Sequence, residues 1–382
     1  MPQRLLLLNQ VEAFLPELLH LLKESVNIDS PSASKLQNDR MADWYTKIFT
    51  GLVGGNVRRI QHPDSGDKLL CEYGAGPKQI LIVGHYDTVW PLGEASRRPF
   101  CIKDQKAYGP GVYDMKAGIL QAFFALKVLK DTRRFPEGKK VVILLNSDEE
   151  IGSPTSRELI EATASQSDLA FVLEPPMEPQ GALKTMRKGS GRYKLIVKGV
   201  SAHAGVNPDK GVSAILELAY QIQKLYALAD PVKGTTINVG VVKGGIGSNV
   251  IAEYAEADID VRVTCIEEAQ RVDAQMKAIR PFLDNSKLNI MGGMIRPPME
   301  KTVESAALFK LAQEIARDEF GFGLEEAATG GVSDGNFTAG MGVPTLDGLG
   351  ASGDHAHSPL EYVRIDQIPF RTALIARLIE SC

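Results

Sequence analysis

Residues 79–87 read Gln-Ile-Leu-Ile-Val-Gly-His-Tyr-Asp, an apolar run that ends in an imidazole and a carboxylate. A short run of this kind, rich in β-branched residues, predicts a buried strand. Residues 140–145 and 169–173 predict two more strands of the same type, and residues 116–129 predict a helix between the first two. Buried strands that alternate with helices favour an α/β domain with a mostly parallel sheet covered by helices on both faces.

Side chains that can bind a metal follow each of these strands. His85 follows the first strand, Glu149 and Glu150 follow the second, and Glu174 follows the third. In a parallel sheet, ligands bind beyond the carboxyl ends of the strands, so we expect these groups to meet in one crevice. A lone histidine after a strand is more often structural, but its convergence with several carboxylates indicates a metal ligand.

Two further carboxylates, Asp87 and Asp114, are placed where they could support metal binding. Asp87 lies two residues after His85, on the same side of an extended backbone, where it could orient a metal-bound imidazole or cap the turn before Trp90. Asp114 follows the glycine-bent segment that begins at Gly109, at the expected start of a helix. It could serve as a helix N-cap or as a carboxylate that bridges two cations.

So many carboxylates in one cleft would repel one another unless cations neutralised them. A ligand set of imidazole and carboxylate without thiolate fits Zn²⁺, with Co²⁺ or Mn²⁺ as substitutes. Glu149 and Glu150 point in different directions because they are adjacent, so one can bind metal while the other, Glu149, takes a proton from the attacking water. A last ligand is expected from the glycine-rich loop near the C-terminus, as His355 or His357.

These motifs resemble those of the dinuclear-zinc family of aminoacylases, succinyl-diaminopimelate desuccinylases and glutamate carboxypeptidases, and most of all the glutamate carboxypeptidases of the carboxypeptidase G type. The resemblance rests on five segments that span nearly the whole chain: Gly84-His-Tyr-Asp-Thr-Val, Gly109-x-Gly-x-x-Asp-Met-Lys, Ser147-Asp-Glu-Glu-Ile-Gly-Ser, Glu174-Pro and His357-Ser-Pro-Leu-Glu-Tyr. It implies two Zn²⁺, one held by His85, Asp114 and Glu174 and the other by Asp114, Glu150 and His357. It also implies that Glu149 is the catalytic base. Asp87, as the carboxylate expected to orient the His85 imidazole, is counted with Glu149 among the expected catalytic residues.

A change of pattern in mid-chain predicts a second domain. Residues 187–296 follow the order β-α-β-β-α-β of a ferredoxin-like unit, whereas residues 1–186 and 297–382 form the discontinuous catalytic domain. The resemblance implies that this inserted α+β domain acts as a lid and joins two chains into a homodimer.

The resemblance also assigns roles within the inserted domain. It implies that His203 reaches into the site of the partner chain to stabilise the oxyanion, and that Asn249 approaches the substrate. Arg296 matches the position that holds a substrate carboxylate, a task that suits a planar bidentate donor. We therefore expect hydrolysis of an amide in an acyl-amino acid or peptide, with release of a C-terminal amino acid and with glutamate favoured. An N-acyl-amino-acid deacylase or a dipeptidase of the same family is the alternative.

Composition excludes other classes of protein. The chain has 382 residues, 44% hydrophobic and 24% charged, and a formal net charge of −4, which gives no footprint for nucleic acid. Its four cysteines form no C-x-x-C pair, which fits a reducing cytoplasm. The apolar run of residues 5–8 is too short for a secretion signal, and no stretch is long enough to span a membrane.

Three rival interpretations carry less weight. Gly331-Val-Ser333-Asp-Gly satisfies the G-x-S-x-G pattern of serine hydrolases, with Asp354 and His357 in the right order, but no buried strand precedes Ser333. A nucleotide-binding reading of the two glycines near residue 110 lacks the third glycine and the preceding strand. A binding protein without catalysis would have little reason to keep Glu149 beside a complete ligand set.

Overall fold

The computed structural model describes residues 3–382. By its internal contacts the chain divides into two compact units: the first comprises the described residues up to 186 together with 301–328 and 333–382, and the second comprises 187–300 and 329–332. The chain therefore re-enters the first unit at residue 301, a few residues later than the boundary at residue 297 that the sequence predicted. Arg187 and Met299 exchange both backbone hydrogen bonds at 3.0 Å, so the entering and leaving segments stay paired almost to residue 300.

The first unit contains a six-stranded sheet in the order β1-β2-β6-β3-β7-β16. Strands β6, β3, β7 and β16 are parallel neighbours, whereas β1 and β2 add an antiparallel edge. The predicted mostly parallel central sheet is confirmed, and the antiparallel edge is an addition to it. The strands are β1 (Asn56–Ile60), β2 (Lys68–Gly74), β3 (Lys78–His85), β6 (Lys139–Asn146), β7 (Leu169–Val172) and β16 (Thr345–Leu346).

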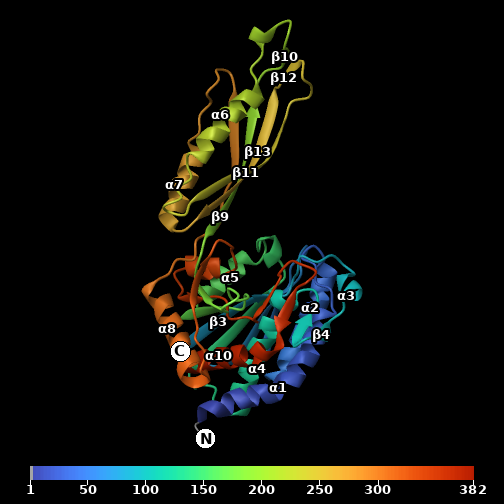
Figure 1. Cartoon of the computed structure of the whole chain (residues 1–382), viewed down its shortest axis with the longest axis vertical. Helices are drawn as coiled ribbons and strands as arrows, with labels where there is room; N and C mark the ends of the chain where they lie inside the picture. The colour runs from blue at the N-terminus through green and yellow to red at the C-terminus, as the bar shows by residue number, and fades with distance from the viewer. Residues whose placement is uncertain (1–2) are drawn as a thin grey trace. The chain divides into compact units, whose positions relative to one another are not determined.

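Helices cover both faces of this sheet because its central strands are apolar on both sides. In β3, Ile80 and Ile82 join the core formed with α1, α4, α8 and α10, whereas Leu81 and Val83 join the core formed with α5 and α9. Figure 1 shows α1, α4 and α10 packed together below the sheet. The helices are α1 (Gln3–Val26), α2 (Lys35–Leu52), α3 (Glu94–Arg97), α4 (Ala117–Asp131), α5 (Arg157–Ala164), α8 (Val303–Phe320), α9 (Gly335–Gly340) and α10 (Ile368–Ser381).

Smaller elements complete the first unit. A four-stranded antiparallel sheet, β17-β18-β5-β4, was not predicted from the sequence because its strands are only two or three residues long. A second small sheet pairs β8 with β15. The bounds are β4 (Cys101–Lys103), β5 (Lys106–Tyr108), β17 (Gly353–Asp354), β18 (Tyr362–Arg364), β8 (Leu183–Arg187) and β15 (Glu326–Thr329), with single turns η1 (Val112–Lys116), η2 (Glu149–Ile151) and η4 (Ile365–Gln367).

The second unit has the β-α-β-β-α-β order expected from the sequence. Its antiparallel sheet runs β11-β13-β9-β14, and α6 and α7 pack on one face of it (Figure 1). This is the strand order of a ferredoxin-like domain, in which the first and third strands are central. The elements are β9 (Gly189–Lys198), α6 (Ala214–Tyr226), β11 (Thr236–Gly244), β13 (Tyr254–Val263), α7 (Ile266–Lys277) and β14 (Lys287–Arg296), with the short additions β10 (Ala202–His203), β12 (Val250–Ile251) and η3 (Pro208–Lys210).

The apolar N-terminal run of residues 5–8 lies within α1, the first helix of the first unit. Within residues 3–382, none of the helices combines the length and the apolarity that a membrane span requires. All four cysteines are free thiols, and Cys71 is buried in the core.

Candidate metal centre

The register of the three central strands brings the predicted ligands to one edge of the sheet. His85 is the last residue of β3 and lies opposite Asn146, the last residue of β6. On the other side of β3, Val83 lies opposite Val172, so Glu174 follows β7 at the level of His85. Because the three strands are parallel, their carboxyl ends form one rim, as the sequence predicted.

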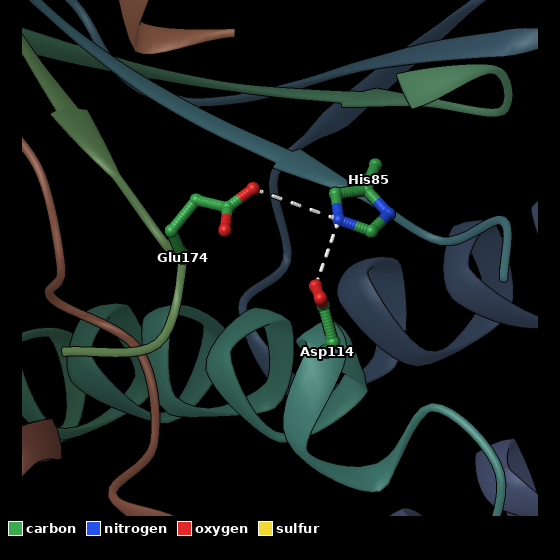
Figure 2. Close-up of side chains that lie close together, drawn as sticks. All are labelled: His85, Asp114 and Glu174. Carbon is green, nitrogen blue, oxygen red and sulfur yellow. Dashed lines mark hydrogen bonds and ion pairs between the residues drawn. The ribbon is translucent and has the colours of Figure 1, made fainter. Parts of the chain in front are cut away.

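The first ligand group consists of His85, Asp114 and Glu174. The Nε2 atom of His85 lies 3.1 Å from Oδ1 of Asp114 and 3.8 Å from Oε1 of Glu174. Figure 2 shows both carboxylates directed at this one ring nitrogen, from the loop before α4 and from the end of β7. The imidazole is only 2% exposed, so this group is closed to bulk solvent on the histidine side.

The second ligand group consists of Asp114, Glu150 and His357. The Nε2 atom of His357 lies 3.4 Å from Oδ2 of Asp114 and 3.1 Å from Oε2 of Glu150. Asp114 therefore turns one oxygen toward each histidine, which is the arrangement that a carboxylate bridging two cations requires. His357 is half-exposed, with 52% of its side chain accessible. His355, the other candidate in this loop, lies 4.0 Å from Asp354 and belongs to neither group.

The loop that presents Asp114 is held by backbone hydrogen bonds to a buried carboxylate. Asp114 lies in the turn η1 with non-helical φ and ψ, and α4 begins only at Ala117, so Asp114 is not the N-cap of that helix. Glu361 accepts hydrogen bonds from the N–H groups of Gly111, Tyr113 and Asp114 at 2.9–3.1 Å. Its burial raises the pKa of Glu361 to about 7, against the lowering effect of these three donors.

Asp87 connects the first ligand group to the turn that carries Glu149 and Glu150. Its carboxylate accepts hydrogen bonds from the backbone N–H groups of both glutamates at 3.2 Å and from the Ser32 hydroxyl at 2.7 Å. The Nδ1 atom of His85 lies 3.1 Å from the Asp87 carbonyl oxygen and 3.5 Å from its carboxylate. Asp87 thus contacts the imidazole through two oxygens, and its carboxylate also fixes the turn after β6.

The charges of the two groups depend on one another. Burial opposes the charge of His85, yet the carboxylates of Asp114 and Asp87 raise its pKa well above the usual range. Hydrogen bonds to Asp114 and Glu150 raise the pKa of His357 to about 10. Asp114 is buried, but the two histidines hold its pKa well below the usual value, whereas burial raises the pKa of Glu150. Positive charge is therefore favoured at both positions that face Asp114.

The geometry of both groups fits a metal ion. Each offers three ligand atoms that lie within 4.8 Å of one another, from imidazole and carboxylate without thiolate. Ligand atoms at the corners of a tetrahedron around Zn²⁺, with bonds of about 2.0–2.1 Å, lie about 3.3 Å apart. The measured separations of 3.1–3.8 Å agree with that spacing. One cation in each group would also neutralise the three carboxylates that meet here.

Comparison with known proteins identifies the family of the chain. The profile of "Peptidase family M20/M25/M40" matches residues 81–381. The chain belongs to this family. It is 32% identical to carboxypeptidase G2 of Pseudomonas sp. (strain RS-16) over 82% of this chain and 76% of that protein. It is 30% identical to acetylornithine deacetylase of Klebsiella pneumoniae (strain 342) over 65% of this chain and 68% of that protein.

The fold agrees with this membership. The structure of aminopeptidase PepT from Bacillus cereus superimposes with a TM-score of 0.77 at 24% identity, covering 96% of this chain and 98% of that one. As a member of the M20 family with carboxypeptidase and deacetylase relatives, the protein is a metal-dependent hydrolase. The resemblance inferred from the five motifs is confirmed.

The three residues assigned to substrate lie in the second unit. His203 ends β10 and Asn249 precedes β12, and the two are neighbours because the Ala204 N–H donates to the Asn249 carbonyl oxygen at 3.0 Å. Both side chains are exposed. Arg296 is the last residue of β14 and is 2% exposed. Their roles toward the substrate remain predictions.

The geometry contradicts two of the rival interpretations, the serine hydrolase and the nucleotide-binding loop. The hydroxyl of Ser333 is buried and donates to Asp347 at 2.7 Å, so it is not an exposed nucleophile. The nearest preceding strand, β15, ends at Thr329 and leaves no strand directly before Ser333. The Gly111 N–H, which a phosphate loop would need, donates to Glu361 instead.

Sequence reasoning gave no role to two buried carboxylates near the site. Glu361 was noted only as part of the motif that follows His357. Asp148 precedes Glu149 and Glu150, and its carboxylate accepts hydrogen bonds from the N–H and hydroxyl of Thr155 at 2.8 and 2.7 Å and from the Ser156 hydroxyl. The sequence feature that could have indicated a buried Glu361 is its position directly before the apolar segment Tyr-Val at residues 362–363.

Proposed function

We propose that the protein hydrolyses the amide bond of a peptide or an acyl-amino acid and releases the C-terminal amino acid, with glutamate favoured. The observation that carries the proposal is the orientation of Asp114, whose two oxygens face two separate ligand groups beside the adjacent pair Glu149 and Glu150. We propose Zn²⁺ for both groups. In enzymes with two such cations, the metals make a water molecule acidic near neutral pH and polarise the carbonyl of the substrate.

Glu149 acts as the general base and then as the general acid. Its neighbour Glu150 lies 3.1 Å from Nε2 of His357, and adjacent side chains point in different directions, so Glu150 can bind metal while Glu149 transfers protons. Glu149 takes the proton of the attacking water and passes it to the nitrogen of the leaving amine. The Asp87 carboxylate supports this step because it accepts a hydrogen bond of 3.2 Å from the backbone N–H of Glu149 and also contacts His85.

Two arguments favour a C-terminal glutamate. The chain shares 32% identity with carboxypeptidase G2, and Arg296 stands where the family resemblance places the group that holds a substrate carboxylate. The second candidate is the deacylation of an N-acyl-amino acid, which the 30% identity to acetylornithine deacetylase supports. A dipeptidase activity would use the same centre.

The second unit is proposed to pair two copies of the chain and to act as a lid. Strand β11 lies at an edge of its sheet and exposes Val241 and Val242. An exposed edge strand with apolar side chains is a template for pairing with another chain. In the dimer, His203 of each copy would stabilise the oxyanion and Asn249 would contact the substrate. The free thiols of Cys71, Cys101, Cys265 and Cys382 suit a cytoplasmic location, which we also propose.

A chelation and reconstitution assay tests the proposal. The protein is stripped of metal, reloaded with Zn²⁺, Co²⁺ or Mn²⁺, and assayed on matched N-acyl-glutamate, N-acyl-alanine, N-acetylornithine and dipeptide substrates. We expect activity to disappear on chelation and to return with about two metals per chain. Activity that survives complete metal removal would refute the assignment. Faster turnover of N-acetylornithine than of N-acyl-glutamate would favour the second candidate.

The role of His203 across the dimer is tested by mixing two inactive variants. His203→Ala and Glu149→Gln chains are unfolded together and refolded as a mixture. If His203 acts in the partner's site, half the dimers are hybrids with one intact site of two, and activity returns to about a quarter of the wild-type value. If His203 acts within its own chain, each hybrid dimer has no intact site, and the mixture stays inactive.

A further inference from the structure

The carboxylate of Glu361 is the meeting point of four N–H donors. Oε1 accepts hydrogen bonds from the N–H groups of Tyr113 and Asp114 at 2.9 and 3.1 Å. Oε2 accepts one from the Gly111 N–H at 2.9 Å and one from the indole N–H of Trp90 at 3.2 Å. The side chain is 1% exposed, so these donors take the place of water. Each oxygen receives two donors, which uses both lone-pair directions of each oxygen.

These contacts join two segments of the chain. One carries Asp114, the carboxylate shared by both ligand groups, and the other carries the exposed His357. Three of the four donors lie in the loop that ends in Asp114, and Asp114 itself supplies one of them. Glu361 lies four residues after His357, in a turn closed by the hydrogen bonds of Ser358 N–H to His355 O and of Glu361 N–H to Ser358 O, both 3.0 Å. The neighbouring residue, Tyr362, begins β18 and pairs with Tyr108 of β5. The turn is therefore anchored on its far side.

We propose that Glu361 is a positioning residue of the metal centre, which sets the spacing between the Asp114 loop and the His357 segment without binding metal itself. This inference rests on the proposed two-metal function. A carboxylate is needed because all four partners are donors. A glutamine would turn its amide N–H₂ toward two of them, so two hydrogen bonds would be replaced by donor-donor repulsion. The Asp114 backbone would then shift relative to His357.

A second contact supports the same arrangement. The guanidinium of Arg98 lies 4.2 Å from the ring centroid of Trp90 and donates to the Pro359 carbonyl oxygen at 2.8 Å. Trp90 and the His357 turn are therefore connected twice, once through Glu361 and once through Arg98. The indole is thus held where its N–H can reach Glu361.

The test compares Glu361→Gln with a matched control, Glu217→Gln. Glu217 is also a buried carboxylate that accepts backbone hydrogen bonds, from Phe282 and Leu283, but it belongs to the second unit, whereas both ligand groups belong to the first. Binding of Co²⁺ to the metal-free proteins is measured by calorimetry, and the absorption spectrum of the Co²⁺-loaded proteins is recorded. We expect Glu361→Gln to weaken Co²⁺ binding by about 10- to 100-fold and to change the spectrum. The control should melt at a lower temperature with unchanged Co²⁺ affinity and spectrum.

The outcomes separate this inference from the proposed function. Wild-type protein that binds no Co²⁺ would refute the two-metal centre. Wild-type protein that binds two Co²⁺ while Glu361→Gln binds them with equal affinity and the same spectrum would overturn the positioning role alone. If Glu361→Gln does not fold, Trp90→Phe decides, because it removes one donor and keeps an aromatic ring. A smaller loss of Co²⁺ affinity supports the inference, and unchanged affinity overturns it.

Discussion

The two halves of the proposed metal centre, the His85 group and the His357 group, are built in different ways. His85 ends a central strand, is 2% exposed, and contacts Asp87 through its second ring nitrogen. His357 lies in a loop with a positive φ of 60°, is 52% exposed, and depends on side-chain contacts for its place. The sheet thus fixes one ligand group, whereas loop packing fixes the other. We expect the His85 half to hold its metal more firmly than the His357 half.

The largest expected effect concerns Glu149, the proposed base. Glu149→Gln keeps the shape of the side chain but removes its ability to take a proton, so turnover should fall by about 1000-fold. Metal content should stay at the wild-type value, because Glu150 supplies the carboxylate that lies 3.1 Å from Nε2 of His357. Near-normal turnover would show that another group is the base, and loss of metal would show that Glu149 is a ligand.

The expected difference in metal affinity between the His85 half and the His357 half is tested by removing metal stepwise. Under increasing chelator, one metal per chain should leave first, with an affinity at least about tenfold weaker than that of the second. His357→Ala should keep one bound metal, held by His85, Asp114 and Glu174. His85→Ala should lose the tighter one. Metal analysis after dialysis gives the result, and equal retention by the two variants would contradict the difference between the halves.

The pH dependence of metal binding follows from the raised pKa of both histidines. In the metal-free chain the pKa of His357 is about 10, so the ring is protonated at neutral pH and a cation must displace that proton. The apparent affinity should therefore rise with pH, by up to about tenfold per unit for each proton released. Calorimetry in buffers of different ionisation enthalpy counts these protons. Affinity that is independent of pH would show that the histidines are neutral before metal binds.

The smallest effect on turnover is expected at a buried residue outside both halves. Ser333→Ala should leave turnover within about twofold of wild type, because its hydroxyl donates to Asp347 and takes no part in the ligand groups. Loss of this buried hydrogen bond should lower the free energy of unfolding by about 1–3 kcal/mol. Denaturant melts and a kinetic assay measure both quantities. A large loss of turnover without loss of stability would revive the serine-hydrolase interpretation.

Much of the buried half could be predicted from the sequence. Apolar runs ending at His85, before Glu149 and before Glu174 predict strands, and parallel strands bring their ends to one rim whatever the rest of the chain does. The helix predicted between the first two strands was also correct, although its ends differ by one or two residues: α4 spans Ala117–Asp131 rather than residues 116–129. The short strands β17 and β18 were missed because two or three residues carry no usable pattern.

Local periodicity and short motifs were enough to predict the two-unit order, the strand ends and the types of ligand. The folded chain was needed to show that Asp114 turns one oxygen to each histidine, and that Glu361 holds the Asp114 loop from 247 residues away. The reason is physical: a buried carboxylate takes whichever backbone N–H groups the fold brings to it, and no local pattern records those partners.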